Sequence, residues 1–203
     1  FPPLRTTSWE SSKGPDSDIQ TKSNPTTEDL LPLLRGDIDP RLDKLKQWII
    51  NLYFERLKRE EQERGGGKRY EQLINNIFEV ANKLTHPLTV RYVGVEQSTN
   101  RIIVETEKDG QIPIEAVSQG ITSMLGWIGV LMQRMYEVYD QDEEPLKQYA
   151  LVLMDEIDAH MHPAWQQSLV PRLRGIFPNV QFVATTHSPL IVSGMPASQL
   201  FRF

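Results

Sequence analysis

Residues 150–156 read ALVLMDE, a short apolar run that ends abruptly in two carboxylates. An apolar run without polar alternation is typical of a strand that neighbouring elements cover on both faces. The sequence therefore predicts a strand that is buried on both faces and that delivers Asp155 and Glu156 at its carboxyl end.

A second apolar strand is predicted in the stretch VQFVATTHSP, residues 180–189. Between the two strands, residues 163–176 carry apolar side chains at helical spacing. Strand, helix and strand in this order indicate a β-α-β unit, whose parallel strands end at one edge of the sheet, where ligands bind in open α/β folds. If the strands are neighbours, the acidic pair and His187 converge at that edge.

The rest of the chain divides into predicted segments. Six prolines fall in the first forty residues, and since proline interrupts helices and central strands, residues 1–39 are predicted to be a proline-rich leader or linker. Residues 40–87 hold two amphipathic patterns separated by Gly65–Gly67, which predicts a helical hairpin arm. Residues 88–203 form the remaining segment, which contains the β-α-β unit.

This last segment begins with alternating and β-branched residues. The stretches 88–95 and 101–106 flank a loop of hairpin length, which predicts a small antiparallel β-hairpin. Apolar residues then recur at helical spacing from 121 to 138, behind a predicted helix start at VSQG, residues 117–120. The methionines and aromatic residues of this helix are most simply core filling.

Composition excludes several classes of protein. With 22 Lys and Arg against 27 Asp and Glu, the net charge of -5 does not fit a basic nucleic-acid coat protein. The chain has no cysteine, which excludes disulfides and thiolate metal sites. No apolar run approaches the roughly 18–20 residues that a membrane-spanning helix needs. The sequence predicts a soluble, cytoplasmic protein without a membrane segment.

Two adjacent acids at a strand end suit phosphoryl transfer. Successive side chains on a strand diverge, so one carboxylate can hold a hydrated Mg²⁺ ion while the other positions water. A carboxylate that orients or deprotonates the attacking water contributes roughly 10²–10⁴ in rate. An acidic pair alone is more often an ordinary strand-to-loop transition, but together with the loop, the helix and the strand that ends in TTHSP it indicates nucleotide chemistry at Asp155 and Glu156.

Four motifs resemble those of a known family. LVLMDE at 151–156 resembles a Walker B strand with its catalytic glutamate, IDAHMHP at 157–163 resembles the loop that follows it in ABC-type ATPases, and TTHSP at 185–189 resembles their switch-histidine segment. Upstream, VSQG at 117–120 resembles the ABC signature, with departures from its usual form. The chain is thus similar to the ABC/SMC-like AAA ATPases that include the RecF, OLD and bacterial anti-phage defence groups. The resemblance implies an α/β fold in which residues 88–203 form the C-terminal lobe of an ABC-type ATPase head, a parallel sheet with flanking helices.

The same resemblance implies roles for individual residues. Matched position by position, Asp155 serves Mg²⁺, Glu156 activates water and His187 contacts the γ-phosphate of ATP. Asp158 falls in the loop that faces the partner subunit.

The signature resemblance implies a second protomer. Ser118, Gln119 and Gly120 would bind the γ-phosphate of the nucleotide held by the opposite protomer, where free backbone N–H groups and the helix dipole favour an anion. The implied activity is ATP hydrolysis in a head-to-tail homodimer. Its opening and closing would control DNA binding or an associated effector such as a nuclease, in anti-phage defence.

One expected motif is absent from the sequence. A phosphate-binding loop needs Gly-x-x-x-x-Gly-Lys-Ser/Thr, whereas the run Gly65–Lys68 is followed by Arg69, and Gln62 stands where the first glycine belongs. The N-terminal half of the head, with its lysine, is therefore expected in cis or in another polypeptide. This chain by itself is expected to be inactive.

Two alternatives stay open at this stage. The first is a metal-dependent nuclease or hydrolase that uses Asp155, Glu156, His160 and His187. The second is a non-catalytic regulatory half of an ATPase assembly, which the missing lysine favours.

Overall fold

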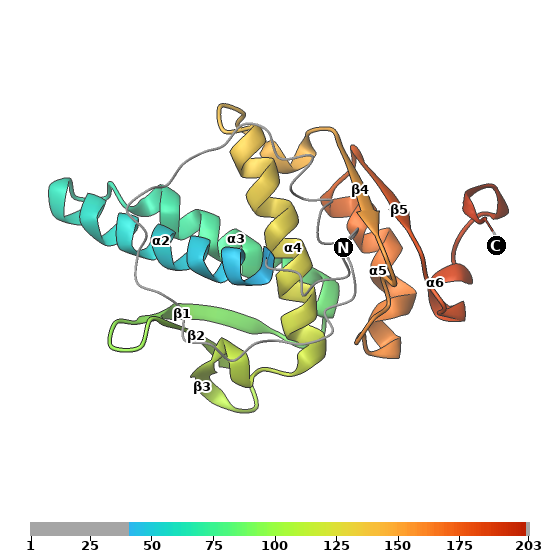
Figure 1. The fold of residues 1–203 in the computed structure, drawn as a ribbon, viewed down its shortest axis with the longest axis horizontal. Coiled ribbons are helices and arrows are strands. Elements are labelled where there is room, and N and C mark those ends of the chain that lie inside the picture. The colour runs from blue at the N-terminus through green and yellow to red at the C-terminus, as the bar shows by residue number, and fades with distance from the viewer. Residues whose placement is uncertain (1–40, 202–203) are drawn as a thin grey trace.

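The computed structural model describes residues 41–201 of the 203, and the leader predicted at 1–39 lies outside the described residues. The helices and strands, in chain order, are α2 (Arg41–Gln62), α3 (Lys68–Thr85), β1 (Val90–Glu96), β2 (Arg101–Thr106), β3 (Gly110–Pro113), α4 (Gln119–Val138), β4 (Ala150–Met154), α5 (Pro163–Ile176), β5 (Val180–Ala184) and α6 (Pro189–Val192) (Figure 1). Short 3-10 turns occupy Ile114–Ala116, Pro145–Lys147 and Ala197–Gln199. The predicted α/β class is confirmed.

Helices α2 and α3 form the predicted hairpin. The connection between them contains Gly65 at φ +85°, a left-handed conformation that glycine adopts without steric cost. Helix α4 packs closely against α2, because a Cβ atom added at Gly129 would lie only 2.3 Å from Cδ2 of Leu45. A side chain at position 129 would therefore force the two helices apart.

The three long helices share one hydrophobic core with the sheets. Its completely buried aliphatic and methionine side chains include Ile50, Ile74, Leu84, Met124, Ile128 and Met132. Trp127 is buried as well. The prediction that the methionines and aromatic residues of 121–138 fill the core is thus confirmed for these positions.

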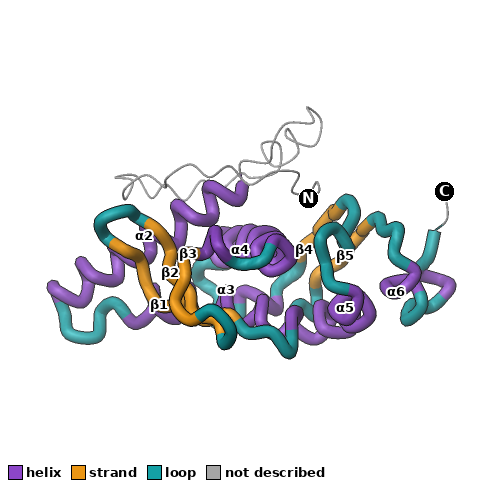
Figure 2. The backbone as a smooth tube through the Cα atoms, turned by 90° about the horizontal axis from the view of Figure 1, so that it is seen from below, coloured by secondary structure: helices purple, strands orange, loops and turns teal. Residues whose placement is uncertain are grey.

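The antiparallel sheet has the order β1-β2-β3, and its first two strands form the predicted hairpin. The turn between them ends at Asn100, which has φ +53°, a conformation that asparagine tolerates better than most residues. Helix α4 lies between this sheet and the strands β4 and β5 in both views of the backbone (Figures 1 and 2). The start of α4 lies next to the loop that follows β4, which contains the acidic motif.

Strands β4 and β5 pair in parallel, with Met154 opposite Ala184. The prediction that the two strands of the β-α-β unit are neighbours is confirmed. Val152 and Met154 are buried in the core, and the ring of Phe182 on β5 packs against Phe177 at the end of α5 with centroids 6.3 Å apart. One face of the pair is therefore covered.

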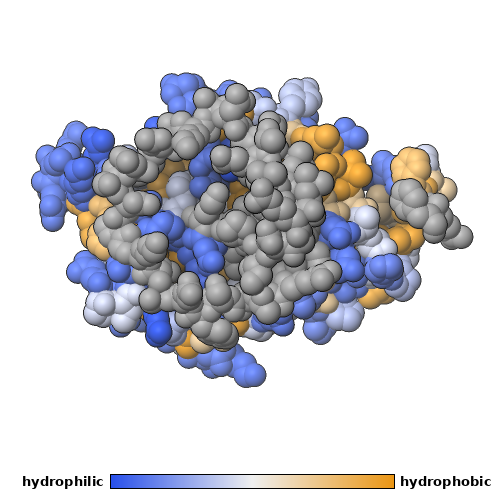
Figure 3. Space-filling model, in the orientation of Figure 1, coloured by the Kyte–Doolittle hydropathy of each residue, from blue (hydrophilic) through white to orange (hydrophobic). Residues whose placement is uncertain are grey.

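The other face of this pair is open. Leu151, Leu153 and Val183 are 62%, 47% and 52% exposed, and hydrophobic surface is visible where these strands lie (Figure 3). The prediction that strand 150–154 is buried on both faces is therefore wrong for the described part of the chain. The physical reason is that an apolar run indicates only that both faces of a strand favour burial, whereas residues 41–201 bury just one face of these strands.

Two tyrosines in the core give a matched pair for a stability test. The hydroxyl of Tyr92 is buried and has no hydrogen-bond partner among residues 41–201, whereas that of Tyr136 accepts a bond from Nδ2 of Asn76 at 3.1 Å. An unsatisfied buried polar group costs about 1–3 kcal/mol, and a satisfied one contributes about 1 kcal/mol. In urea unfolding at pH 7 we expect Tyr92→Phe to leave the free energy of unfolding unchanged or higher, and Tyr136→Phe to lower it by about 1 kcal/mol. The reverse order would contradict the assigned environments.

The same pair predicts a pH dependence. Burial raises the pKa of both Tyr92 and Tyr136 above the ordinary value of 10.0. Because the folded-state pKa is the higher one, ionisation of these phenols does not lower the free energy of unfolding below about pH 10, and it lowers that free energy increasingly as the pH rises further. Tyr92→Phe should weaken this alkaline loss in the same unfolding measurement.

Candidate functional site

The carboxyl ends of β4 and β5 are tied together beyond the strands themselves. The N–H of Thr185 donates to the carbonyl of Met154, and the N–H of Ile157 donates to the carbonyl of Thr185, both at 3.0 Å. The acidic loop that follows β4 and the TTHSP segment that follows β5 therefore lie side by side at one edge of the sheet.

Asp155 is exposed at this edge and has one defined partner in the neighbouring segment. Its Oδ1 atom accepts a hydrogen bond from Oγ1 of Thr185 at 2.5 Å. An ionised carboxylate offers about four lone-pair sites, so this bond orients the group and leaves capacity for a cation.

Glu156 has an unusual backbone. Its φ angle is +48°, a left-handed conformation that costs a non-glycine residue roughly 1–2 kcal/mol. The N–H of Glu156 donates to Oγ1 of Thr185 at 2.8 Å, and its carbonyl accepts from the N–H of Ala159 at 2.8 Å. Backbone strain that is held by surrounding bonds concentrates at functional sites, and the chain turns sharply here, directly after Asp155.

Asp158 and His187 lie on the two joined segments. Oγ1 of Thr186 donates to Oδ1 of Asp158, and the N–H of Ser188 donates to Oγ1 of Thr186 at 3.0 Å. His187 stands between these two hydroxyl residues and is exposed. The structure thus places the predicted imidazole and the three predicted acids at one sheet edge.

The TTHSP segment is also anchored to helix α5. Oγ of Ser188 donates to Oε1 of Gln166 at 2.6 Å and accepts from the N–H of Leu190 at 3.1 Å. The segment that carries His187 is therefore held on both sides, by the acidic loop and by α5.

The signature-like segment begins α4 where the sequence placed a helix start. Ser118 is the N-cap residue, is exposed, and its side chain makes no capping hydrogen bond. A Cβ atom added at Gly120 would lie 2.6 Å from the backbone oxygen of His160. The amino end of α4 therefore lies directly against the acidic loop, at a contact that only glycine allows. Residues 118–120 and this loop are neighbours within one chain.

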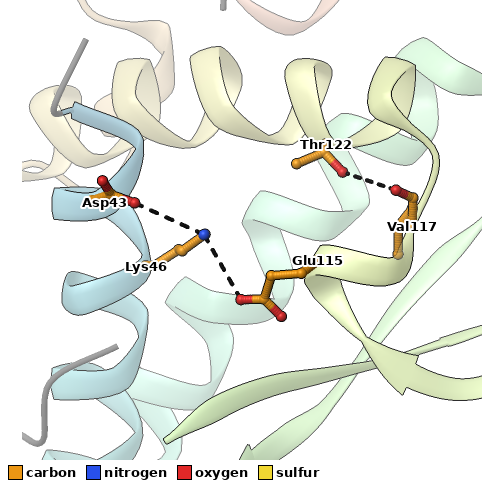
Figure 4. Close-up of polar contacts among 5 residues, drawn as sticks. All are labelled: Asp43, Lys46, Glu115, Val117 and Thr122. Atoms are coloured by element: carbon orange, nitrogen blue, oxygen red, sulfur yellow. Dashed lines mark hydrogen bonds and ion pairs between the residues drawn. The ribbon is translucent and has the colours of Figure 1, made fainter. Parts of the chain in front are cut away.

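The same segment is linked to the helical hairpin (Figure 4). Nζ of Lys46, a buried lysine on α2, lies 3.8 Å from Oε1 of Glu115 and 3.9 Å from Oδ1 of Asp43. Glu115 belongs to the 3-10 turn just before the segment, and Oγ1 of Thr122 donates to the carbonyl of Val117 at 3.4 Å. The Lys46–Glu115 ion pair thereby links the hairpin to the turn that precedes α4.

Residues 41–201 contain no group of three or more His, Asp and Glu side chains arranged to hold a metal ion. Mg²⁺ fits this edge nonetheless, because it is commonly bound by one or two carboxylates together with nucleotide phosphates and water. Asp155 offers such a carboxylate. The glycines at 65–67 connect α2 to α3, which begins at Lys68, and they follow a helix rather than the strand that a phosphate loop follows. None of the helices in the described part of the chain has the length and apolar character to cross a bilayer.

Sequence reasoning missed two hydroxyl residues, Thr185 and Thr186, which make the side-chain bonds to Asp155 and Asp158. A signal was present. Extending the parallel register by one residue beyond Met154 and Ala184 sets position 155 opposite position 185, so a hydroxyl there was placed to meet the first acid.

Comparison with known proteins supports the family resemblance. Residues 10–193 match the family described as "AAA domain, putative AbiEii toxin, Type IV TA system". A retron Vc95 probable ATPase from Vibrio cholerae serotype O1 biovar El Tor is 39% identical over 108 residues, which make up 53% of this chain and 21% of that protein. A Septu protein PtuA from Bacillus thuringiensis is 32% identical over 114 residues, 55% of this chain and 28% of that protein. The chain therefore spans less than a third of each of these relatives.

Among solved structures, the Smc head domain from Pyrococcus furiosus, with an extended coiled coil and bound to the C-terminal domain of ScpA, aligns with a TM-score of 0.45 and 17% identity. The alignment covers 82% of this chain and 47% of that chain.

Proposed function

This chain belongs to the AAA-domain family that matches residues 10–193, and from that premise we propose that it supplies the carboxylate and histidine side of an ATP-hydrolysing site. The family resemblance read from the sequence is thereby confirmed, while the activity of the intact protein is our proposal. The observation that carries it is the joining of the acidic loop and the TTHSP segment at one sheet edge by bonds through Thr185.

Within this site each residue has a proposed task. Asp155 would hold Mg²⁺, which neutralises charge on the phosphate oxygens when it is bound. Glu156 would accept a proton from the attacking water or orient that water. His187, exposed on the adjoining segment, would donate a hydrogen bond to the γ-phosphate.

We further propose that the site is completed by a second protomer. Ser118 is exposed and its hydroxyl is not used to cap its own helix, so it is available to a phosphate held by a facing copy. Gln119 and Gly120 present first-turn N–H groups beside it. Asp158 lies in the loop that packs next to this segment, which supports a single surface for partner contact.

The remaining parts of the assembly are also proposals. The lysine-bearing phosphate loop would come from another segment or another chain, because the 203 residues contain no such motif. As the family resemblance implies, ATP-driven opening and closing would control DNA or an effector protein, a nuclease for example, in anti-phage defence in the cytoplasm. A similar chain named as a retron probable ATPase supports the ATPase part of this proposal.

Asp155→Asn tests the proposed metal role in the intact protein. The amide keeps one oxygen but loses the charge, so we expect the Mg²⁺ concentration for half-maximal ATP hydrolysis to rise by at least about 10–100-fold, the loss usual for groups that only support a metal ligand. The matched control is Asp109→Asn, because Asp109 is also exposed and also accepts a bond from a threonine hydroxyl, that of Thr106 at 3.3 Å. The control should keep the wild-type Mg²⁺ dependence.

Other outcomes would redirect the interpretation. Absence of ATP hydrolysis by the intact wild-type protein would contradict the proposal and favour the regulatory alternative. Cleavage of DNA that needs a divalent metal but no nucleotide, and that is lost in Asp155→Asn, would favour the nuclease alternative.

A further inference from the structure

We propose that Thr185 and Thr186 are positioning residues that join the acidic loop to the segment carrying His187, so that the acids and the imidazole keep one fixed arrangement. This inference rests on the proposed ATPase function. Neither threonine is assigned a contact with nucleotide or metal, and both act through the residues they hold.

Thr185 makes two bonds with one oxygen. Its Oγ1 atom donates a hydrogen bond to Oδ1 of Asp155 at 2.5 Å, and the same Oγ1 atom accepts a hydrogen bond from the N–H of Glu156 at 2.8 Å. A threonine hydroxyl has one donor and two acceptor positions, so the direction of its proton is set by the carboxylate. A single side chain thereby orients the first acid and the backbone of the second.

The second bond acts where the backbone is strained. Glu156 is held at φ +48°, and its N–H would otherwise have to find water. Without the hydroxyl, the strained conformation loses one of the bonds that hold it, and the backbone can relax toward an ordinary extended or helical conformation. Relaxation there would move the proposed base relative to the proposed metal ligand.

Thr186 also makes one bond to an acid of the loop, and its second bond stays within its own segment. It donates to Asp158 and accepts the N–H of Ser188 at 3.0 Å. His187 directly follows Thr186 and precedes Ser188, so the hydroxyl that binds Asp158 also binds the backbone on the far side of the imidazole residue. A displacement of Asp158 by a partner subunit would be passed to the imidazole through this pair of bonds.

The test compares threonine variants in the intact protein with ATP and Mg²⁺. Thr185→Val keeps the shape and removes the hydroxyl, and we expect kcat to fall about 10–100-fold with the KM for ATP within about threefold of wild type. Thr185→Ser keeps the hydroxyl and should retain kcat within about threefold of wild type. Thr99→Val is the matched control, because Thr99 is an exposed threonine that donates to a carboxylate, that of Glu96, away from the site.

A second measurement does not depend on turnover. Mn²⁺ binding, followed by electron paramagnetic resonance in the presence of a non-hydrolysable ATP analogue, should be about tenfold weaker in Thr185→Val and unchanged in Thr185→Ser. Thermal unfolding identifies any variant that fails to fold, and Thr185→Ala then replaces valine as the variant without a hydroxyl.

The results separate this inference from the proposed function. If the wild-type protein hydrolyses ATP and Thr185→Val retains both its kcat and its Mn²⁺ affinity, the positioning role is overturned while the ATPase assignment stands. If Thr185→Ser is as impaired as Thr185→Val, the hydroxyl is not what matters and the inference also fails. A wild-type protein without hydrolysis overturns the proposed function, and the Mn²⁺ titration still decides whether Thr185 orients Asp155.

Discussion

Glu156→Gln should lower ATP turnover by the intact protein about 10²–10⁴-fold, the usual contribution of a positioned general base. Glutamine matches the size of glutamate and tolerates the same backbone, so the left-handed turn at φ +48° and the N–H bond to Thr185 are both expected to persist. What the amide cannot do is accept a proton from water. Steady-state hydrolysis assays measure the loss, and equilibrium binding of labelled ATP should be unchanged.

The same variant should accumulate the ATP-bound dimer, because the step that ends that state is blocked. Size-exclusion chromatography with light scattering would show a doubled mass in ATP for Glu156→Gln and a mixed population for wild type. Glu107→Gln serves as the control, since Glu107 is an exposed glutamate that accepts a bond from Thr89 at 3.3 Å in the antiparallel sheet region. Undiminished hydrolysis in Glu156→Gln would remove this residue from the mechanism.

The β-α-β unit could be predicted because its signals are local. An apolar run needs no knowledge of its neighbours to be recognised as a strand, and the crossover rule then makes β4 and β5 parallel with their ends together. The helical hairpin was predictable for the same reason, because the glycines at 65–67 interrupt its helical periodicity. The start of α4 was predictable because helical periodicity begins just after residues 117–120.

Features that depend on contacts between segments were not predictable in this way. The open face with Leu151 and Leu153 could not be foreseen, since an apolar run does not say which layers the rest of the molecule supplies. The left-handed conformation of Glu156 is held by a bond to Thr185, in the segment that follows β5. The close approach of Gly120 to His160 joins residues forty positions apart.

Ser118→Glu should abolish ATP-driven dimerisation and lower turnover about 10²–10³-fold, comparable to the loss of a donor to a reacting oxyanion. The reason is electrostatic, because the variant places a negative charge where the proposal places the γ-phosphate of the facing protomer. The fold should be unaffected, since Ser118 is exposed, makes no capping bond, and acidic residues at a helix start are favourable. Ser98→Glu in the exposed turn before β2 is the control, and ATP binding by the isolated Ser118→Glu protomer should match that of wild type.

Mixing the two variants tests the head-to-tail geometry directly. In a Glu156→Gln dimer every site lacks its base, and Ser118→Glu protomers do not pair with one another in ATP because both sites would face a repelling charge, so each variant is inactive alone. A mixed dimer is different, because one of its sites takes Glu156 from one protomer and Ser118 from the other and is intact, while its second site carries both defects. With random exchange, about half of the dimers are mixed and one of the two sites in each is intact, so an equimolar mixture should recover up to about a quarter of wild-type turnover. Such a recovery requires a symmetric assembly in which each site is shared by two protomers. If both residues instead served the same nucleotide from within one chain, no mixed dimer would contain an intact site, and the mixture would stay as inactive as its components.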